Sequence, residues 1–115
     1  MIAVQNEFNC TRQGIDATCL GENASATGDY TSAIGANSTA SGFQATAVGA
    51  VAAATNGSVA IGAFANATAT NGVAIGVASN ATGLSSVAVG ENARAEGKRS
   101  IVFGYQALAL SLIHI

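Results

Sequence analysis

Two cysteines, one histidine and a few carboxylates are the residues of this chain best suited to chemistry. Cys10 and Cys19 are close in sequence, but no histidine or paired acid lies near them, so they do not predict a metal site. The only histidine, His114, is close to the C-terminus. The acids are scattered along the chain: Glu7, Asp16, Glu22, Asp29, Glu91 and Glu96. Without a carboxylate pair, a nucleophile beside a base or a ligand cluster, we expect no enzyme, no cofactor and no metal.

Composition narrows the classes of partner. The 115 residues are 50% hydrophobic but only 5% aromatic and 9% charged, and the formal net charge is −2. Such a weakly charged chain is not typical of nucleic-acid-binding proteins. The longest apolar stretch, near residues 107–113, is too short and interrupted to span a bilayer, so we expect no membrane insertion by this segment. Neither end carries a capping feature, and we expect the chain to be part of a longer protein.

Glycines recur with a fixed period. The seven that close a short apolar run, here called the anchor glycines, are Gly21, Gly35, Gly49, Gly62, Gly76, Gly90 and Gly104, with spacings of 14, 14, 13, 14, 14 and 14. In four units a second glycine follows at the half-period: Gly28, Gly42, Gly83 and Gly97. The short unit after Gly49 has Asn56-Gly57 instead, and the unit after Gly62 has Asn71-Gly72. We therefore expect altered corners in these two units.

The period predicts a β-solenoid. Each glycine would cost a helix about 1 kcal/mol relative to alanine, which excludes a coiled coil. β-branched residues cluster before the anchor glycines, as strands prefer. Each unit therefore predicts strand, turn, strand, turn, with glycine allowing left-handed backbone at the corners. We expect an all-β, parallel β-roll of about seven 14-residue turns, stacked about 4.8 Å apart.

The two strands of each unit differ in their patterns. Three and five residues after each anchor glycine lie small residues, as in Ala24 and Ala26, with Ser25 and Thr27 between and after them. This alternation predicts one strand with alanine inward and a polar outer face. The other strand has alanine on one face and larger apolar residues on the opposite face: Ile34, Val48, Val59, Ile61, Val73, Ile75, Val87, Val89, Ile101 and Phe103.

A strand that is apolar on both faces must be buried on both. A roll of two strands per turn has only one interior, so the second face requires another chain. The pattern leaves open which face meets that chain. The narrow interior favours alanine inside, with the Ile/Val face at the interface.

The repeats resemble a known family. Ser58-Val59-Ala60-Ile61-Gly62 and Ser86-Val87-Ala88-Val89-Gly90 are similar to the S-V-A-I-G repeat of YadA-like heads in trimeric autotransporter adhesins. The following Ala93-Arg94-Ala95-Glu96-Gly97 also matches the family pattern. The resemblance covers residues 14–110. It implies a left-handed parallel β-roll, a homotrimer, and display on the extracellular side of a bacterial outer membrane.

The ends of the chain depart from the repeat. Residues 1–13 predict a degenerate or partial N-terminal turn, and residues 14–110 the head repeats. Residues 111–115 do not fit the pattern, and two interpretations stay open: a frayed end, or an artefactual tail translated from adapter sequence.

Several features have a structural and a functional interpretation. For Cys10 and Cys19 the favoured interpretation is two buried thiols in place of alanine, and a disulfide across the first turn is the alternative. Arg94, Lys98 and Arg99 favour a solvated basic face over a ligand patch. Six N-x-S/T sequons are better explained by turn chemistry than by glycosylation; they begin at Asn9, Asn23, Asn37, Asn56, Asn66 and Asn80.

The resemblance favours an adhesive head segment that binds host or environmental surfaces by multivalent contacts, with a matrix protein or surface glycan as partner. A structural segment of a phage tail fibre is the main alternative. An ice-binding solenoid is a third hypothesis, because a hydroxyl column runs along the outer strand: Thr27, Ser41, Thr55, Thr68 and Thr82. Its companion column is not uniform, which disfavours ice. The sequence does not identify the receptor.

Overall fold

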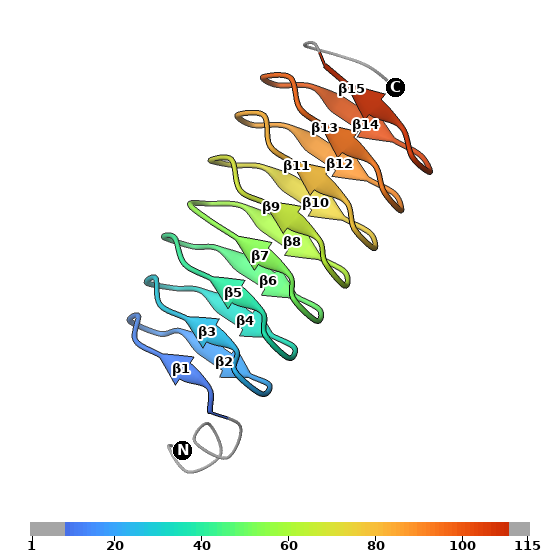
Figure 1. Ribbon diagram of the computed structural model, residues 1–115. Helices are drawn as coiled ribbons and strands as arrows, with labels where there is room; N and C mark the ends of the chain where they lie inside the picture. Colours follow the sequence, from blue (N-terminus) through green and yellow to red (C-terminus); the bar gives the residue numbers. More distant parts are fainter. Residues whose placement is uncertain (1–8, 111–115) are drawn as a thin grey trace.

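The computed structural model describes residues 9–110, which form a stack of parallel turns with two short strands in each turn (Figure 1). The strands are β1 (Thr11–Arg12), β2 (Thr18–Leu20), β3 (Ser25–Ala26), β4 (Ser32–Ile34), β5 (Thr39–Ala40), β6 (Thr46–Val48), β7 (Ala53–Ala54), β8 (Val59–Ile61), β9 (Asn66–Ala67), β10 (Val73–Ile75), β11 (Asn80–Ala81), β12 (Val87–Val89), β13 (Arg94–Ala95), β14 (Ile101–Phe103) and β15 (Leu108–Ala109). The predicted parallel β-solenoid of about seven turns is therefore confirmed.

The strands form two parallel sheets that face each other. The odd-numbered strands make an eight-stranded sheet in the order β1-β3-β5-β7-β9-β11-β13-β15, and the even-numbered strands a seven-stranded sheet from β2 to β14. Every strand pairs with the equivalent strand of the next turn, so that Ala74 is opposite Ala60 on one side and Ala88 on the other. This register places equivalent residues of all turns in straight columns.

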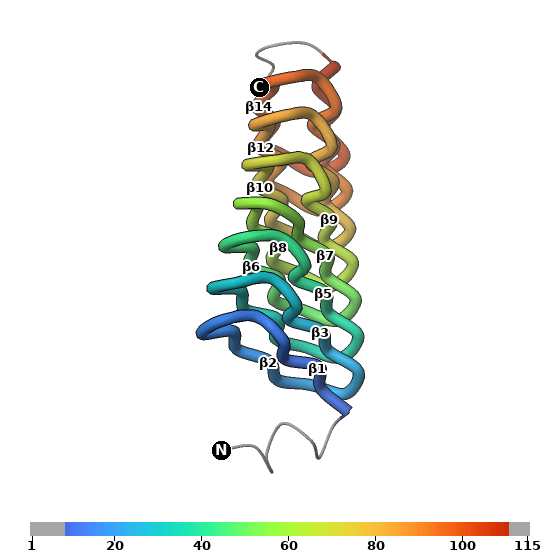
Figure 2. Tube along the Cα trace, turned by 90° about the vertical axis from the view of Figure 1, so that its left-hand side faces the viewer, coloured from blue at the N-terminus to red at the C-terminus, as the bar shows by residue number. Residues whose placement is uncertain are grey.

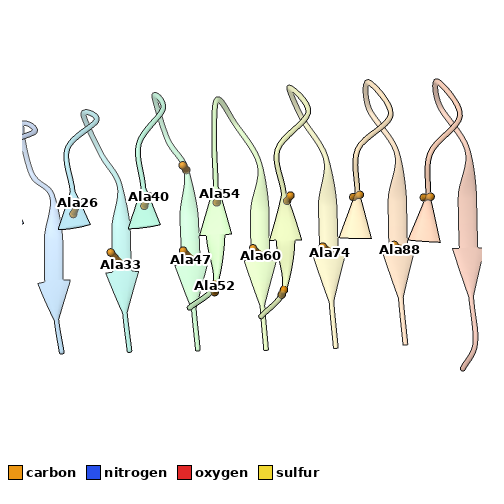
Figure 3. Packing of buried hydrophobic residues seen from close by; sticks show 14 of the residues in the cluster. Ala26, Ala33, Ala40, Ala47, Ala52, Ala54, Ala60, Ala74 and Ala88 are labelled. Atoms are coloured by element: carbon orange, nitrogen blue, oxygen red, sulfur yellow. The ribbon is translucent and has the colours of Figure 1, made fainter. Parts of the chain in front are cut away.

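The interior consists mainly of alanine, with a few buried serine and threonine side chains. Ala33, Ala47, Ala60, Ala74 and Ala88 of the seven-stranded sheet are fully buried and face the alanines of the other sheet (Figure 3). Because no bulky side chain separates the sheets, the roll is flat, with extents of 45 × 22 × 12 Å (Figure 2). The expectation that the alanine face points inward is thus confirmed.

The anchor glycines form the corner that follows each three-residue strand. Their φ angles lie between 124° and 132°, a region that side-chain-bearing residues rarely adopt. They also lie very close to one another, since a Cβ on Gly35 would be 2.6 Å from the carbonyl oxygen of Gly49. Both constraints select glycine at this column.

The second corner differs from the prediction. Gly28, Gly42, Gly83 and Gly97 do not have positive φ. The left-handed residue lies two positions later, for example Tyr30 with a φ of 60°. Glycine is needed there because consecutive turns approach closely: a Cβ on Gly28 would be 2.5 Å from the carbonyl oxygen of Gly42. Stacking, and not backbone freedom, therefore explains the second glycine.

Of the two exceptional units, only the short one has an altered corner: four residues join β7 to β8, where five join β5 to β6. In the short unit Gly57 itself is left-handed, with a φ of 63°. In the next unit the expectation was wrong, because Asn71 has a φ of 60°, as Gln44 does in an ordinary corner. The Gly72 N–H donates to the Ala69 carbonyl at 3.1 Å, just as the Ala45 N–H donates to the Gly42 carbonyl at 3.1 Å. The Val59 N–H then donates to the Gly72 carbonyl at 2.9 Å, so the stack remains continuous through both units.

The first described turn is partial. Strand β1 falls within the segment predicted as a degenerate turn, and it pairs in register with β3. Glu7, His114 and the segment 111–115 lie outside the described residues.

Candidate functional site

The outer side of the seven-stranded sheet is a broad apolar surface, here called the apolar face. Its columns are Thr18, Ser32, Thr46, Val59, Val73, Val87 and Ile101, and Leu20, Ile34, Val48, Ile61, Ile75, Val89 and Phe103. None of these side chains is buried, and Phe103 is 52% exposed. All ten large apolar residues singled out from the sequence lie on this face.

Strand geometry explains why these residues face outward. Successive side chains of a strand point to opposite sides of the sheet, and the middle residue of each three-residue strand enters the interior. The interior column of this sheet holds alanine except at Cys19 and Val102, so the space between the sheets suits small side chains. The flanking Ile and Val residues must therefore lie on the outside.

Leu20 is a member of the apolar face that the sequence pattern did not single out. It is 48% exposed and pairs in register with Ile34. The signal was present, since Leu20 precedes the first anchor glycine as Ile34 precedes the second. The neighbouring column is polar at this end, with Thr18, Ser32 and Thr46, so the apolar face widens toward the C-terminal turns.

The outer side of the eight-stranded sheet, here called the polar face, has a different chemistry. Its columns are Ser25, Thr39, Ala53, Asn66, Asn80 and Arg94, and Thr27, Ser41, Thr55, Thr68, Thr82 and Glu96. The second column is not uniform in conformation. The Thr55 hydroxyl donates to the Thr68 carbonyl at 3.0 Å, and Thr55 is half-buried where Thr68 and Thr82 are exposed.

Charge is confined to the two ends of the roll. Residues 30–90 contain no Asp, Glu, Lys, Arg or His. The N-terminal turns carry Asp16, Glu22 and Asp29, and the C-terminal turns carry the predicted basic residues Arg94, Lys98 and Arg99. All three basic side chains are exposed, and Arg94 forms an ion pair with Glu96 on the polar face. The solvated interpretation of this cluster agrees with that exposure.

Exposed apolar side chains also occur at the corners, where the sequence pattern did not predict them. Tyr30 and Phe43 occupy neighbouring corners and are 50% and 54% exposed. Their rings meet edge to face, with centroids 5.8 Å apart and an interplanar angle of 89°. Such pairs stabilise beyond the area they bury. No periodic signal marks them, because the corner positions vary from turn to turn.

Cys10 and Cys19 form a disulfide, so the favoured interpretation of two free thiols was wrong. Cys19 is the interior residue of β2, and Cys10 lies just before β1 in the opposite sheet, with a Cα–Cα distance of 6.0 Å. The bond joins the two sheets across the interior of the first described turn. Sequence separation alone did not show that the two residues face each other.

The sequon asparagines have two different roles. Asn9, Asn23 and Asn37 are left-handed corner residues, as turn chemistry predicts. Asn66 and Asn80 lie instead in β9 and β11, where they pair with each other across the polar face, so the turn explanation was wrong for them. The Oδ1 of Asn56 accepts a hydrogen bond from the Phe43 N–H at 3.2 Å.

Within residues 9–110, no three His, Cys, Asp or Glu side chains are grouped to hold a metal ion, and no pocket opens on the surface. Over the same residues, no helix has the length and hydropathy needed to cross a membrane. What the surface offers is extended: one apolar face, one neutral polar face and two rows of corners.

Comparison with known proteins agrees with this description. The model of the YadA head domain repeat matches residues 13–38, 56–79 and 81–107, which is more than half of the chain. Among solved structures, the collagen-binding domain of the Yersinia adhesin YadA is 29% identical, with a TM-score of 0.69. The match covers 94% of this chain and 70% of that domain. None of the curated proteins compared with the sequence matches it.

Proposed function

Because the chain belongs to the family of YadA head domain repeats, we propose that three copies assemble through their apolar faces into an adhesive head. The observation that carries the proposal is the environment of the Ile and Val columns. They lie outside an interior that small side chains, mostly alanine, fill, yet they form a continuous apolar surface along the roll. Exposed apolar patches of this extent are rare on monomers.

The geometry of the face supports assembly with identical copies. The columns are straight and run the length of the roll, so the same surface on each copy can meet its neighbours around a common axis. Burying Ile61 and Ile75, which are 38% and 37% exposed, would complete the partial burial that each already has. The polar face and the charged ends would remain in contact with water.

The family and the fold are those of an adhesin domain, and we place this head at the cell surface, on the extracellular side of a bacterial outer membrane. An assembly of three rolls presents each surface motif many times, so contacts that are weak individually can sum to strong attachment. This suits a molecule without a deep pocket. A matrix protein or a surface glycan is the class of partner that such a surface fits.

The adhesive function is tested by binding assays on the purified protein. The assembled chain should be retained on at least one member of an array of matrix proteins, collagen included, and glycans. A variant that is monomeric because Ile61 and Ile75 are replaced by glutamate should lose most of that retention, since avidity depends on assembly. A trimer that binds no member of the array would instead favour a structural spacer of the tail-fibre type.

A further inference from the structure

We propose that the polar face is a binding surface for an uncharged, hydroxyl-rich polysaccharide. The proposal rests on the adhesive function above and names the class of ligand. Its site is the outer side of strands β5, β7, β9 and β11, together with the neighbouring corner at Tyr30 and Phe43.

The first support for the proposal is that strands β5, β7, β9 and β11 contain no charged side chain. The four strands lie within residues 30–90, which contain no ionisable side chain of the Asp, Glu, Lys, Arg or His types. A polyanion such as a sulfated glycan would lose hydration on this surface without gaining an ion pair, which is unfavourable. A neutral polymer does not have this cost. The surface is therefore matched in charge to a neutral ligand.

The second support is that the polar face can form hydrogen bonds with a sugar. Serine and threonine hydroxyls each donate and accept hydrogen bonds, as do the hydroxyls of a sugar. Thr39, Ser41, Thr68 and Thr82 are exposed on this face. The strand backbones are already paired with neighbouring turns, so these side chains are the groups left to bind a ligand.

The third support is the regular spacing of hydroxyl groups along the polar face. The second column repeats a hydroxyl in each turn, about every 4.8 Å along the roll, at Ser41, Thr55, Thr68 and Thr82. A polymer lying along this column would meet a hydroxyl in each turn, and its many weak contacts would add. A small ligand would gain only one of these contacts, and no pocket on the described surface would enclose it.

The aromatic pair adds an apolar contact of the right kind. Tyr30 and Phe43 lie in the corners that directly follow Thr27 and Ser41, so they border the second polar column. Exposed aromatic rings pack against the C–H face of sugar rings, while a tyrosine hydroxyl can hydrogen-bond to their edge. An array that bound ice would need regular hydroxyls, and Thr55 breaks that regularity by bonding to the Thr68 carbonyl.

The chain itself supplies substitutions that its fold accepts. Glu96 lies in the same column as Thr68 and Thr82, so Thr68→Glu with Thr82→Glu places charge on the polar face at a position that tolerates glutamate. Glu22 and Glu91 follow anchor glycines, as Ala36 and Ala50 do. Ala36→Glu with Ala50→Glu is therefore a control that adds the same charge at the opposite corner.

The experiment measures retention of the full chain on cellulose, cross-linked dextran and galactomannan, with heparin–agarose and collagen for comparison. We expect retention on at least one neutral polymer, unchanged between about 0.05 M and about 1 M salt, where charge attraction is screened. The face variant should weaken it about tenfold, equivalent to 1.4 kcal/mol. The corner variant should bind as the unaltered chain does.

Retention only on heparin–agarose or collagen would overturn the polysaccharide proposal while leaving the adhesive function intact. Equal binding by the face variant, or equal loss in the corner variant, would remove the polar face as the site. Thermal hysteresis without polymer binding would identify an ice-binding surface instead. A correctly assembled chain retained on none of these surfaces or on the wider array would overturn both proposals.

Discussion

Ala74 and Ile75 are consecutive residues of β10 with opposite environments. Ala74 is completely buried between the two sheets, whereas Ile75 is 37% exposed on the apolar face. The smaller apolar residue is inside and the larger one outside, the reverse of the usual arrangement in a globular core. The relationship recurs at Ala60 and Ile61. It explains both the thinness of the roll and its need for a partner.

The first prediction concerns the size of the interior. Replacing Ala81 by leucine should overpack the roll and lower its stability by about 1–3 kcal/mol per chain, because Ala81 is fully buried between sheets without spare volume. Thermal unfolding measures the effect. Asn80→Leu is the matched control, since Leu108 already occupies that outer column and the residue is adjacent. Equal melting temperatures for the two variants would contradict an alanine-filled interior.

Buried hydroxyl groups give a second prediction. The Ser58 Oγ lies 2.9 Å from the Thr55 carbonyl and 2.8 Å from that of Ala67, and it accepts from the Thr55 N–H at 2.7 Å. The Ser86 Oγ is buried without a hydrogen-bond partner. Ser58→Ala should therefore cost about 1 kcal/mol, whereas Ser86→Ala should be neutral or stabilising.

Denaturant unfolding of these two variants provides the measurement. Ala45 occupies the equivalent column, so neither substitution introduces a new shape into the interior. If Ser86→Ala lowers the free energy of unfolding as much as Ser58→Ala does, the account is wrong that only the Ser58 hydroxyl is hydrogen-bonded.

The sequence predicted the columns but not the corners. Period and alternation place Ala74 and Val73 on opposite faces, because successive side chains of a strand point to opposite sides. They left open which face is inside, and only the narrow interior favoured alanine. The conformation of Gly28 could not be predicted, since it depends on how closely the Gly42 carbonyl approaches from the next turn. The Cys10–Cys19 bond was missed for a similar reason: it depends on two residues meeting across the interior.

Among the candidate surfaces, the apolar face followed from the pattern of β-branched residues. The aromatic pair of Tyr30 and Phe43 did not, because corner residues lie in variable positions that carry no period. The neutrality of residues 30–90 is visible in the sequence. This neutrality points to an uncharged ligand only once the structure shows which of those residues share an exposed face.

Backbone strain gives a third prediction. Val51 has a φ of 61°, a conformation that is unfavourable for a β-branched residue, whereas Asn23, Asn37 and Asn92 occupy the same corner position in other turns. Val51→Asn should therefore raise the stability by about 1 kcal/mol. The reverse change, Asn37→Val, should lower the melting temperature. A destabilised Val51→Asn protein would mean that the exposed valine makes a contact worth more than the strain.

The disulfide gives a fourth prediction. It joins the two sheets at the first described turn, where the Thr11 N–H donates to the Ala24 carbonyl at 2.8 Å and the Gln13 N–H to that of Ala26 at 3.0 Å. Replacing both cysteines by alanine should speed amide exchange at Thr11 and Gln13, because the end of the roll is no longer tied. Exchange at Val73, in the middle, should not change. Unchanged protection at all three amides would show that the bond does not hold this turn.

The most direct test of the account is the mass of the purified chain in solution, measured by light scattering. Assembly through the apolar face predicts three chain masses for the unaltered protein and for Thr68→Glu with Thr82→Glu, which changes only the polar face. It predicts one chain mass for Ile61→Glu with Ile75→Glu, since unpaired charge would be buried in the interface. A stable single-chain mass for the unaltered protein would contradict the central claim that the apolar face is an interface between copies.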